Sequence, residues 1–171
     1  MTTPRRPAGP PPSPGVLAKY VEAYARETGV SVGRLRAWIA YMTMAGLLEC
    51  AASAGGPRFL VKGGVALELR LRARARATKD IDLVLQHADA DLARSVERAL
   101  AGESYQGFTF RRKGEPLVLD NGTVNLEFAV SYRGGAWTSI AVDVARAEQS
   151  ESGVEWIDAI PSLSRSASPA R

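Results

Sequence analysis

Apolar residues recur every three or four positions in the first third of the chain. The segment Val16–Thr28 has this spacing and is followed by a glycine, so it predicts a helix. Ser31 is a typical N-cap for a second helix, which we expect to run from about Val32 to Ala52. This second segment is apolar around much of its circumference, so the rest of the domain should cover it, and we expect Cys50 to pack within it.

Short apolar runs and one further helical pattern follow. Phe59–Val61 predicts a short buried strand, and Ile81–Leu85 predicts a second strand. Asp89 is placed to cap a helix from Ala90 to Leu100, in which leucine and valine form one stripe. Four later segments alternate in polarity or lie between turn residues, and each predicts a strand: Phe108–Arg111, Pro116–Leu119, Val124–Val130 and Trp137–Ala145.

The segment Val65–Arg72 permits two interpretations. Its valine and leucine residues alternate with alanine, glutamate and arginine, and this period of two favours a strand. The same residue types, however, are strong helix formers. A helix that begins after the Gly63–Gly64 turn would also point free backbone N–H groups at an anion, and we interpret the segment as a helix.

Together these elements predict an α/β (α+β) domain, with a small mixed β-sheet flanked by helices and two N-terminal helices packed alongside. The chain has 171 residues, which suits one domain, and we place that domain at residues 15–160. The Pro-rich segment 1–14 and the Ser/Arg/Pro-rich segment 161–171 contain almost no apolar residues. We therefore expect both to be disordered tails.

Composition narrows the class of protein. Hydrophobic residues make up 46% and charged residues 23% of the chain, as in an ordinary globular protein. The formal net charge of +4 is compatible with binding to nucleic acid or to a polyphosphate. A single cysteine excludes an intramolecular disulfide and a cluster of cysteine metal ligands. Neither a membrane-spanning run nor a secretory signal is evident, so we expect a cytoplasmic protein that does not enter a membrane.

Two aspartates stand one residue apart at the start of the second predicted strand. Because neighbouring side chains of a strand point to opposite faces, Asp80 and Asp82 share one face and Ile81 lies on the other. Two adjacent carboxylates repel each other, and the apolar residues around them add a cost of desolvation. A divalent cation bound between them would relieve both costs. The pattern therefore predicts a metal site that handles a nucleotide.

The glycine pair, the aspartate pair and a later strand aspartate together resemble the nucleotidyltransferase superfamily. Residues 62–67 read KGGVAL and residues 76–82 read RATKDID. These stretches resemble the K-G-G-x-A-L and R-x-[ST]-x-D-[IL]-D motifs of its AbiEii/AbiGii and MenT-like toxin branch. The resemblance is strongest from Phe59 to Gln86 and continues more weakly to the strand AWTSIAVDVA, which carries Asp143.

This resemblance implies the nucleotidyltransferase fold and Mg²⁺-dependent transfer of a nucleotide from an NTP to an RNA, for the toxin branch the acceptor end of a tRNA. It also implies a toxin–antitoxin or phage-defence setting, with a cognate antitoxin as protein partner. The catalytic residues that would hold one or two Mg²⁺ ions are Asp80, Asp82 and Asp143. The residues that would bind the nucleotide are Lys62, Gly63, Gly64, Arg76 and Thr78.

Several residues near these motifs have competing interpretations. Glu127 is an alternative third carboxylate, but its strand pattern places it on the solvent face of a hairpin. The arginines at positions 70, 72, 74 and 76 form either a solvated basic face or a contact surface for phosphate or RNA. His87 follows the second strand in a loop, and we assign it no catalytic role.

The chain departs from the toxin branch in one respect. Its relatives continue through a helical C-terminal half with further basic residues, and here the sequence ends soon after the strand of Asp143. Two expectations follow: a minimal enzyme completed by a partner, or a truncated reading frame. The rival functions are therefore an inactive remnant that binds NTP or RNA without turnover, and a protein-interaction module that uses the basic face and the apolar helix Val32–Ala52.

Overall fold

The computed structural model describes residues 9–66, 80–86 and 91–147. In these ranges the helices are α1 (Pro14–Thr28), α2 (Val32–Ser53) and α4 (Leu92–Leu100). The strands are β1 (Phe59–Lys62), β2 (Asp80–Leu85), β3 (Phe108–Val118), β4 (Val124–Tyr132) and β5 (Gly135–Arg146). Residues 63–66 are helical and follow β1 directly. None of the helices in the described part of the chain has the length and apolar content needed to cross a bilayer.

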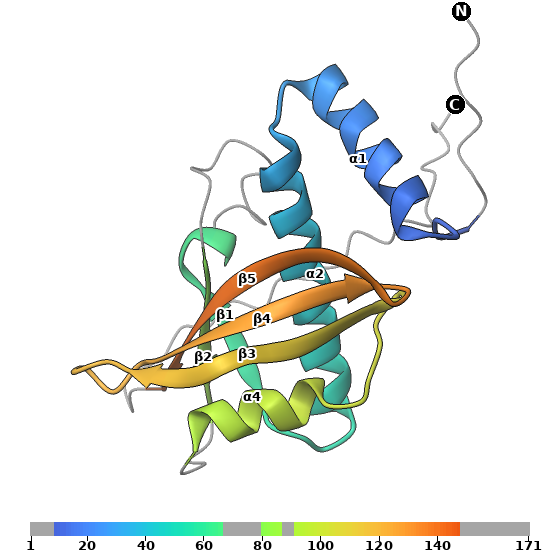
Figure 1. The fold of residues 1–171 in the computed structure, drawn as a ribbon. Helices are drawn as coiled ribbons and strands as arrows, with labels where there is room; N and C mark the ends of the chain where they lie inside the picture. The colour runs from blue at the N-terminus through green and yellow to red at the C-terminus, as the bar shows by residue number, and fades with distance from the viewer. Residues whose placement is uncertain (1–8, 67–79, 87–90, 148–171) are drawn as a thin grey trace, which may run out of the picture.

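The strands form one mixed five-stranded sheet in the order β1-β2-β5-β4-β3. Strands β2 and β5 are parallel, while the other neighbouring pairs are antiparallel. The helices lie on one side of this sheet, with α2 running behind β5 and β4 (Figure 1). The predicted architecture, a mixed sheet flanked by helices with two N-terminal helices, is confirmed.

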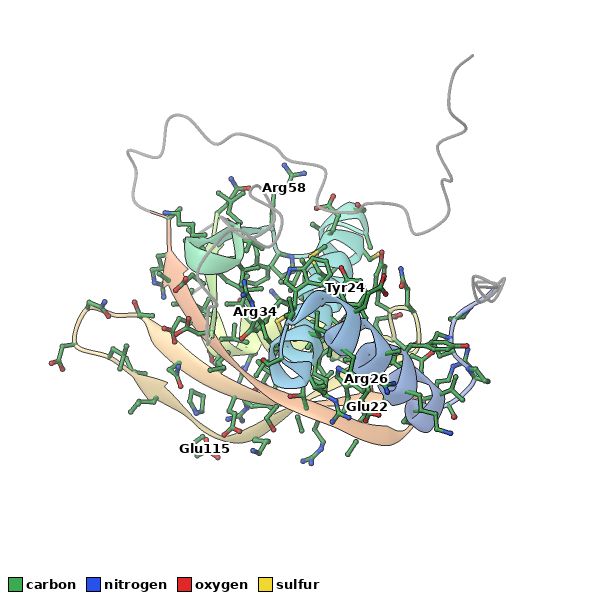
Figure 2. The ribbon with its side chains drawn as sticks, turned by 90° about the horizontal axis from the view of Figure 1, so that it is seen from above. Glu22, Tyr24, Arg26, Arg34, Arg58 and Glu115 are labelled. Carbon is green, nitrogen blue, oxygen red and sulfur yellow. The ribbon has the colours of Figure 1, made fainter. Side chains whose placement is uncertain are left out.

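The two faces of the sheet have opposite character. In β4 the residues at even positions from Val124 to Tyr132 are buried, and those between them are half-buried or exposed. Strand β5 shows the same alternation from Ile140 to Val144. Figure 2 shows Glu115 of β3 on the side of the sheet that faces away from α1 and α2. One face therefore forms the core beneath the helices, and the other is polar.

The helices are fixed to the core face by specific contacts. The indole Nε1 of Trp137 in β5 donates a hydrogen bond to the backbone oxygen of Arg36 in α2 at 3.2 Å, and the Arg36 guanidinium lies 4.9 Å from the centre of the Trp137 ring. In α2, a Cβ added at Gly46 would lie 2.6 Å from the Tyr105 ring. These contacts place α2 close against the sheet.

Capping residues explain where the helices begin. Ser31 caps α2 as predicted, since its side chain accepts a hydrogen bond from the backbone nitrogen of Arg34. Helix α1 begins at Pro14, two residues earlier than predicted, with Ser13 as its N-cap. The cap predicted for the helix Ala90–Leu100 was wrong: Asp91 caps α4, and Asp89 lies outside the described residues.

Three other expectations differ from the structure. The segments predicted as two strands at Phe108–Arg111 and Pro116–Leu119 form the single strand β3, which ends at Val118, because pairing with β4 continues on both sides of an irregularity between Lys113 and Leu117. Cys50 is exposed rather than packed, because it lies near the C-terminal end of α2, where the helix presents a turn to solvent. Strand β1 is half-buried, since it is an edge strand. Of the helix predicted at Val65–Arg72, residues 67–72 lie outside the described part.

The core face predicts a strong response to truncation of Phe128, whose side chain is only 1% exposed in the centre of β4. We expect Phe128→Ala to lower the free energy of unfolding by about 3–5 kcal/mol, because it removes buried apolar surface and leaves a cavity. Denaturant unfolding measures this value. Ser131→Ala, on the polar face of the same strand, is the control and should change stability by less than about 0.5 kcal/mol. Equal effects of the two substitutions would contradict the assignment of the faces.

Candidate active site

Four polar residues form a row across the polar face of the sheet. Strand pairing places Lys62 of β1 opposite Asp82 of β2, Asp82 opposite Asp143 of β5, and Asp143 opposite Asn125 of β4. Directly paired residues of neighbouring strands project from the same face. Asp80 lies two residues before Asp82 on the same strand, so its side chain shares this face. The sheet thus brings all three predicted aspartates together.

The turn after β1 lies against the carboxylate of Asp82. Gly63 has a positive φ of 63°, a backbone conformation that side chains disfavour. A Cβ added at Gly63 would lie 1.8 Å from Oδ2 of Asp82, far inside van der Waals contact. Glycine is therefore required at this position for two separate reasons. This contact places the glycine turn directly beside the aspartate pair.

The electrostatics of the row are unfavourable for three ionised carboxylates. The pKa of Asp82 is raised, first because burial removes its charge from water and then because of the negative charges of Asp80 and Asp143. All three aspartates are half-buried. A cation at this position would stabilise the ionised form of Asp82.

Asp143 has a hydrogen-bond partner outside the sequence motifs. The amide Nδ2 of Asn125 donates a hydrogen bond to Oδ1 of Asp143 at 2.6 Å. One signal in the sequence pointed to Asn125: asparagine is depleted in strands, and here it occupies a polar-face position of a strand whose neighbours Val124 and Leu126 are buried.

The aspartates fit a divalent cation by their chemistry and their position. Carboxylate oxygens are the ligands that Mg²⁺ prefers. Neighbouring strands lie only about 4.7–4.9 Å apart, so two paired side chains can contact the same ion. Within residues 9–66, 80–86 and 91–147, however, no group of three histidine, cysteine, aspartate or glutamate side chains is placed to hold a metal ion. Rotation of the aspartate side chains would have to complete such a site.

The alternative carboxylate, Glu127, lies in the next row of the same face. It pairs with Ala141, which in turn pairs with Asp80. Its side chain is exposed, as expected from the sequence, and forms an ion pair with Lys113 of β3. The charge of Glu127 is thus compensated within the protein.

The remaining predicted residues are only partly placed. Lys62 is exposed at the end of β1, and Gly64 is half-buried in the helical residues that follow the turn. Arg76, Thr78 and His87 lie outside the described residues, as do the other three arginines at positions 70, 72 and 74. Their roles stay predictions from the sequence.

The chain matches the model of a known protein family. The family model described as "Nucleotidyl transferase AbiEii toxin, Type IV TA system" matches residues 46–167. This range contains the five strands of the sheet, the glycine turn and the three aspartates. A search of curated proteins found no match.

The contact between Gly63 and Asp82 predicts the effect of a single methyl group. Gly63→Ala should destabilise the fold by more than the roughly 1–2 kcal/mol that a positive φ costs an alanine, because the methyl group must also displace the Asp82 carboxylate. Thermal and denaturant unfolding measure the loss.

Gly29→Ala is the matched control for this experiment. Gly29 has a φ of 74° and open space around its missing Cβ, so its substitution reports the backbone strain alone. When Asp82 is replaced by alanine, Gly63→Ala should cost about as much as Gly29→Ala. An excess cost that persists without the Asp82 carboxylate would disprove the contact.

The raised pKa of Asp82 predicts a pH dependence of stability. The folded state favours the neutral carboxyl, so this contribution to the free energy of unfolding is fully present below the ordinary pKa of aspartate and is lost as pH rises through the raised value. In EDTA, Asp82→Asn should therefore be more stable than the wild type at pH 7 and should lose this advantage near pH 3. Unfolding curves across this pH range test the prediction, and an Asp82→Asn variant less stable than the wild type at pH 7 would refute it.

Proposed function

The chain belongs to the AbiEii nucleotidyl transferase toxin family of type IV toxin–antitoxin systems, and from this premise we propose that it transfers a nucleotide from an NTP to an RNA acceptor with Mg²⁺ as cofactor. We further propose that the acceptor is a tRNA and that the reaction takes place in the cytoplasm. The family implies a cognate antitoxin as the protein partner.

One observation carries the proposal: the pairing of β2 with β5 places Asp82 opposite Asp143, beside Asp80 and the Gly63 turn. A site for phosphoryl transfer needs carboxylates that hold divalent cations and a turn that admits a phosphate close to the backbone. Both features meet here on the polar face of the sheet. The raised pKa of Asp82 supports the need for a cation at this point.

Each residue then has a physical role. Asp80, Asp82 and Asp143 would hold the Mg²⁺, which when bound supplies positive charge to the triphosphate. Gly63 and Gly64 would let the backbone approach the phosphates, because glycine has no side chain to keep them apart. A side chain at Gly63 would also strike Asp82. In the transfer itself an acceptor hydroxyl gives up its proton to solvent and its oxygen bonds to the α-phosphorus. The bond from the α-phosphorus to the oxygen that bridges it to the β-phosphorus breaks, and pyrophosphate leaves with that oxygen.

The positive charges around the turn would bind the nucleotide. Lys62 lies opposite Asp82 at the end of β1, where its ammonium group would reach phosphate oxygens. Arg76 and Thr78 precede the aspartate pair in the sequence, and we propose that they add a cation and a hydroxyl donor for the triphosphate.

An inactive remnant that binds NTP or RNA without turnover is the second candidate. It is favoured by one observation, that no group of three potential ligands in the described residues is placed to hold a metal ion. In that case the carboxylates and the glycine turn would remain as inherited features without a functional cation site.

The test is incorporation of a labelled NTP into tRNA by the purified full chain with Mg²⁺. Asp80→Ala and Asp82→Ala should abolish incorporation, because each removes a carboxylate from the proposed cation site. Glu127→Gln should retain it, because Glu127 is already paired with Lys113.

The other outcomes separate the rival functions. If calorimetry shows that NTP and Mg²⁺ bind, but none of the four labelled NTPs transfers its label to tRNA, the chain is an inactive remnant. If neither ligand binds and the aspartate substitutions only stabilise the fold, the chain is an interaction module. Loss of incorporation in Glu127→Gln would instead identify Glu127 as the third carboxylate.

A further inference from the structure

Asn125 occupies a position that packing alone does not explain. It is half-buried on the polar face of β4, between the buried residues Val124 and Leu126. Asparagine is among the residues least favoured in strands, and a β-branched residue would suit the backbone better. The side chain must therefore serve an interaction on the polar face.

That interaction is a short hydrogen bond to one oxygen of Asp143. Nδ2 of Asn125 lies 2.6 Å from Oδ1 of Asp143, and hydrogen bonds to an ionised acceptor are stronger than those to a neutral one. Strand β5 lies between β4 and β2, so Asp143 has Asn125 on one side and Asp82 on the other. Because Oδ1 accepts the bond from Asn125, Oδ2 is the oxygen that a cation shared with Asp82 would contact.

Asp143 and its neighbour Glu127 differ in the charge of the group that donates a hydrogen bond to each carboxylate. Both carboxylates project from the same face, but Glu127 is paired with the ammonium group of Lys113, which offsets part of its negative charge. Asn125 fixes the Asp143 carboxylate with a neutral amide, so the full negative charge remains. An amide is thus the type of partner that orients a carboxylate while preserving its attraction for a cation.

We propose that Asn125 is a positioning residue for the cation site: it fixes the Asp143 carboxylate with one oxygen toward Asp82, and so selects Asp143 over Glu127 as the third carboxylate. The inference rests on the proposed function and assigns a role to a residue outside the three aspartates. Hydrogen-bond partners of metal-binding carboxylates orient the ligand, and their loss typically weakens metal binding by about 10- to 100-fold.

A purely structural role makes a different prediction. If the hydrogen bond only joined β4 to β5, its loss would change the stability of the fold and would leave the affinity for a cation unaltered. Cation affinity, measured apart from catalysis, therefore separates the two roles.

The experiment measures binding of Mn²⁺, a paramagnetic substitute for Mg²⁺, to the full chain by electron paramagnetic resonance. Asn125→Ala and Asn125→Val should each bind Mn²⁺ about 10- to 100-fold more weakly than the wild type. The valine variant has a side chain that favours strands, so it keeps the fold intact should the alanine variant be unstable. Ser131→Ala, a polar-face substitution on the same strand, is the control and should bind like the wild type.

Asp143→Ala separates failure of this inference from failure of the proposed function. If the wild type binds Mn²⁺, Asp143→Ala does not, and the Asn125 variants bind like the wild type, the positioning role is overturned and the proposed function stands. If the wild type and Asp143→Ala both fail to bind Mn²⁺, the cation site itself is refuted, and the role of Asn125 is refuted with it.

Discussion

The parallel pairing of β2 with β5 is the constraint on which the candidate site depends. It places Asp82 opposite Asp143, although the two residues lie far apart in the sequence and their strands belong to different parts of the chain. The register of this pair is held by the other face, where Ile81 and Leu83 of β2 lie opposite Val142 and Val144 of β5 and are almost fully buried. A shift of one residue would turn these side chains to water, so the apolar core fixes the position of the carboxylates.

The same arrangement opposes the folding of the cation-free protein. Burial and two neighbouring negative charges raise the pKa of Asp82, which means that its ionised form is less stable in the fold than in water. The turn at Gly63 adds a positive φ and a close approach to this carboxylate. These unfavourable features are concentrated where the end of β1 and the start of β2 meet the interior of β5, as is common where a structure is organised for binding rather than for stability.

Features that depend on local pattern could be predicted from the residues themselves, whereas features that depend on strand pairing could not. The meeting of Asp143 with the aspartate pair was expected only from the family resemblance. Alternation placed Asp80 and Asp82 on one face, and the capping role of Ser31 followed from its neighbours, because both are properties of a few adjacent residues. The cap at Asp91 was missed because a second aspartate two positions earlier satisfies the same local rule. The continuity of β3 depends on its long-range pairing with β4, and the contacts of Gly63 with Asp82 and of Asn125 with Asp143 join separate strands. No period or propensity in a single segment contains that information.

A bound cation would change the balance between the apolar core, which favours folding, and the repulsion among the aspartates, which opposes it. A ligand that binds only the folded state stabilises it in proportion to the logarithm of its concentration over its dissociation constant, so repulsion among the aspartates makes folding and cation binding interdependent. The neutral amide of Asn125 maintains this dependence, because it orients Asp143 without cancelling its charge. The ion pair of Lys113 with Glu127 has the opposite effect two residues further along β4, where the negative charge is already compensated. Two carboxylates on one sheet face thus differ in their availability to a cation, and the difference comes from their partners rather than from their position.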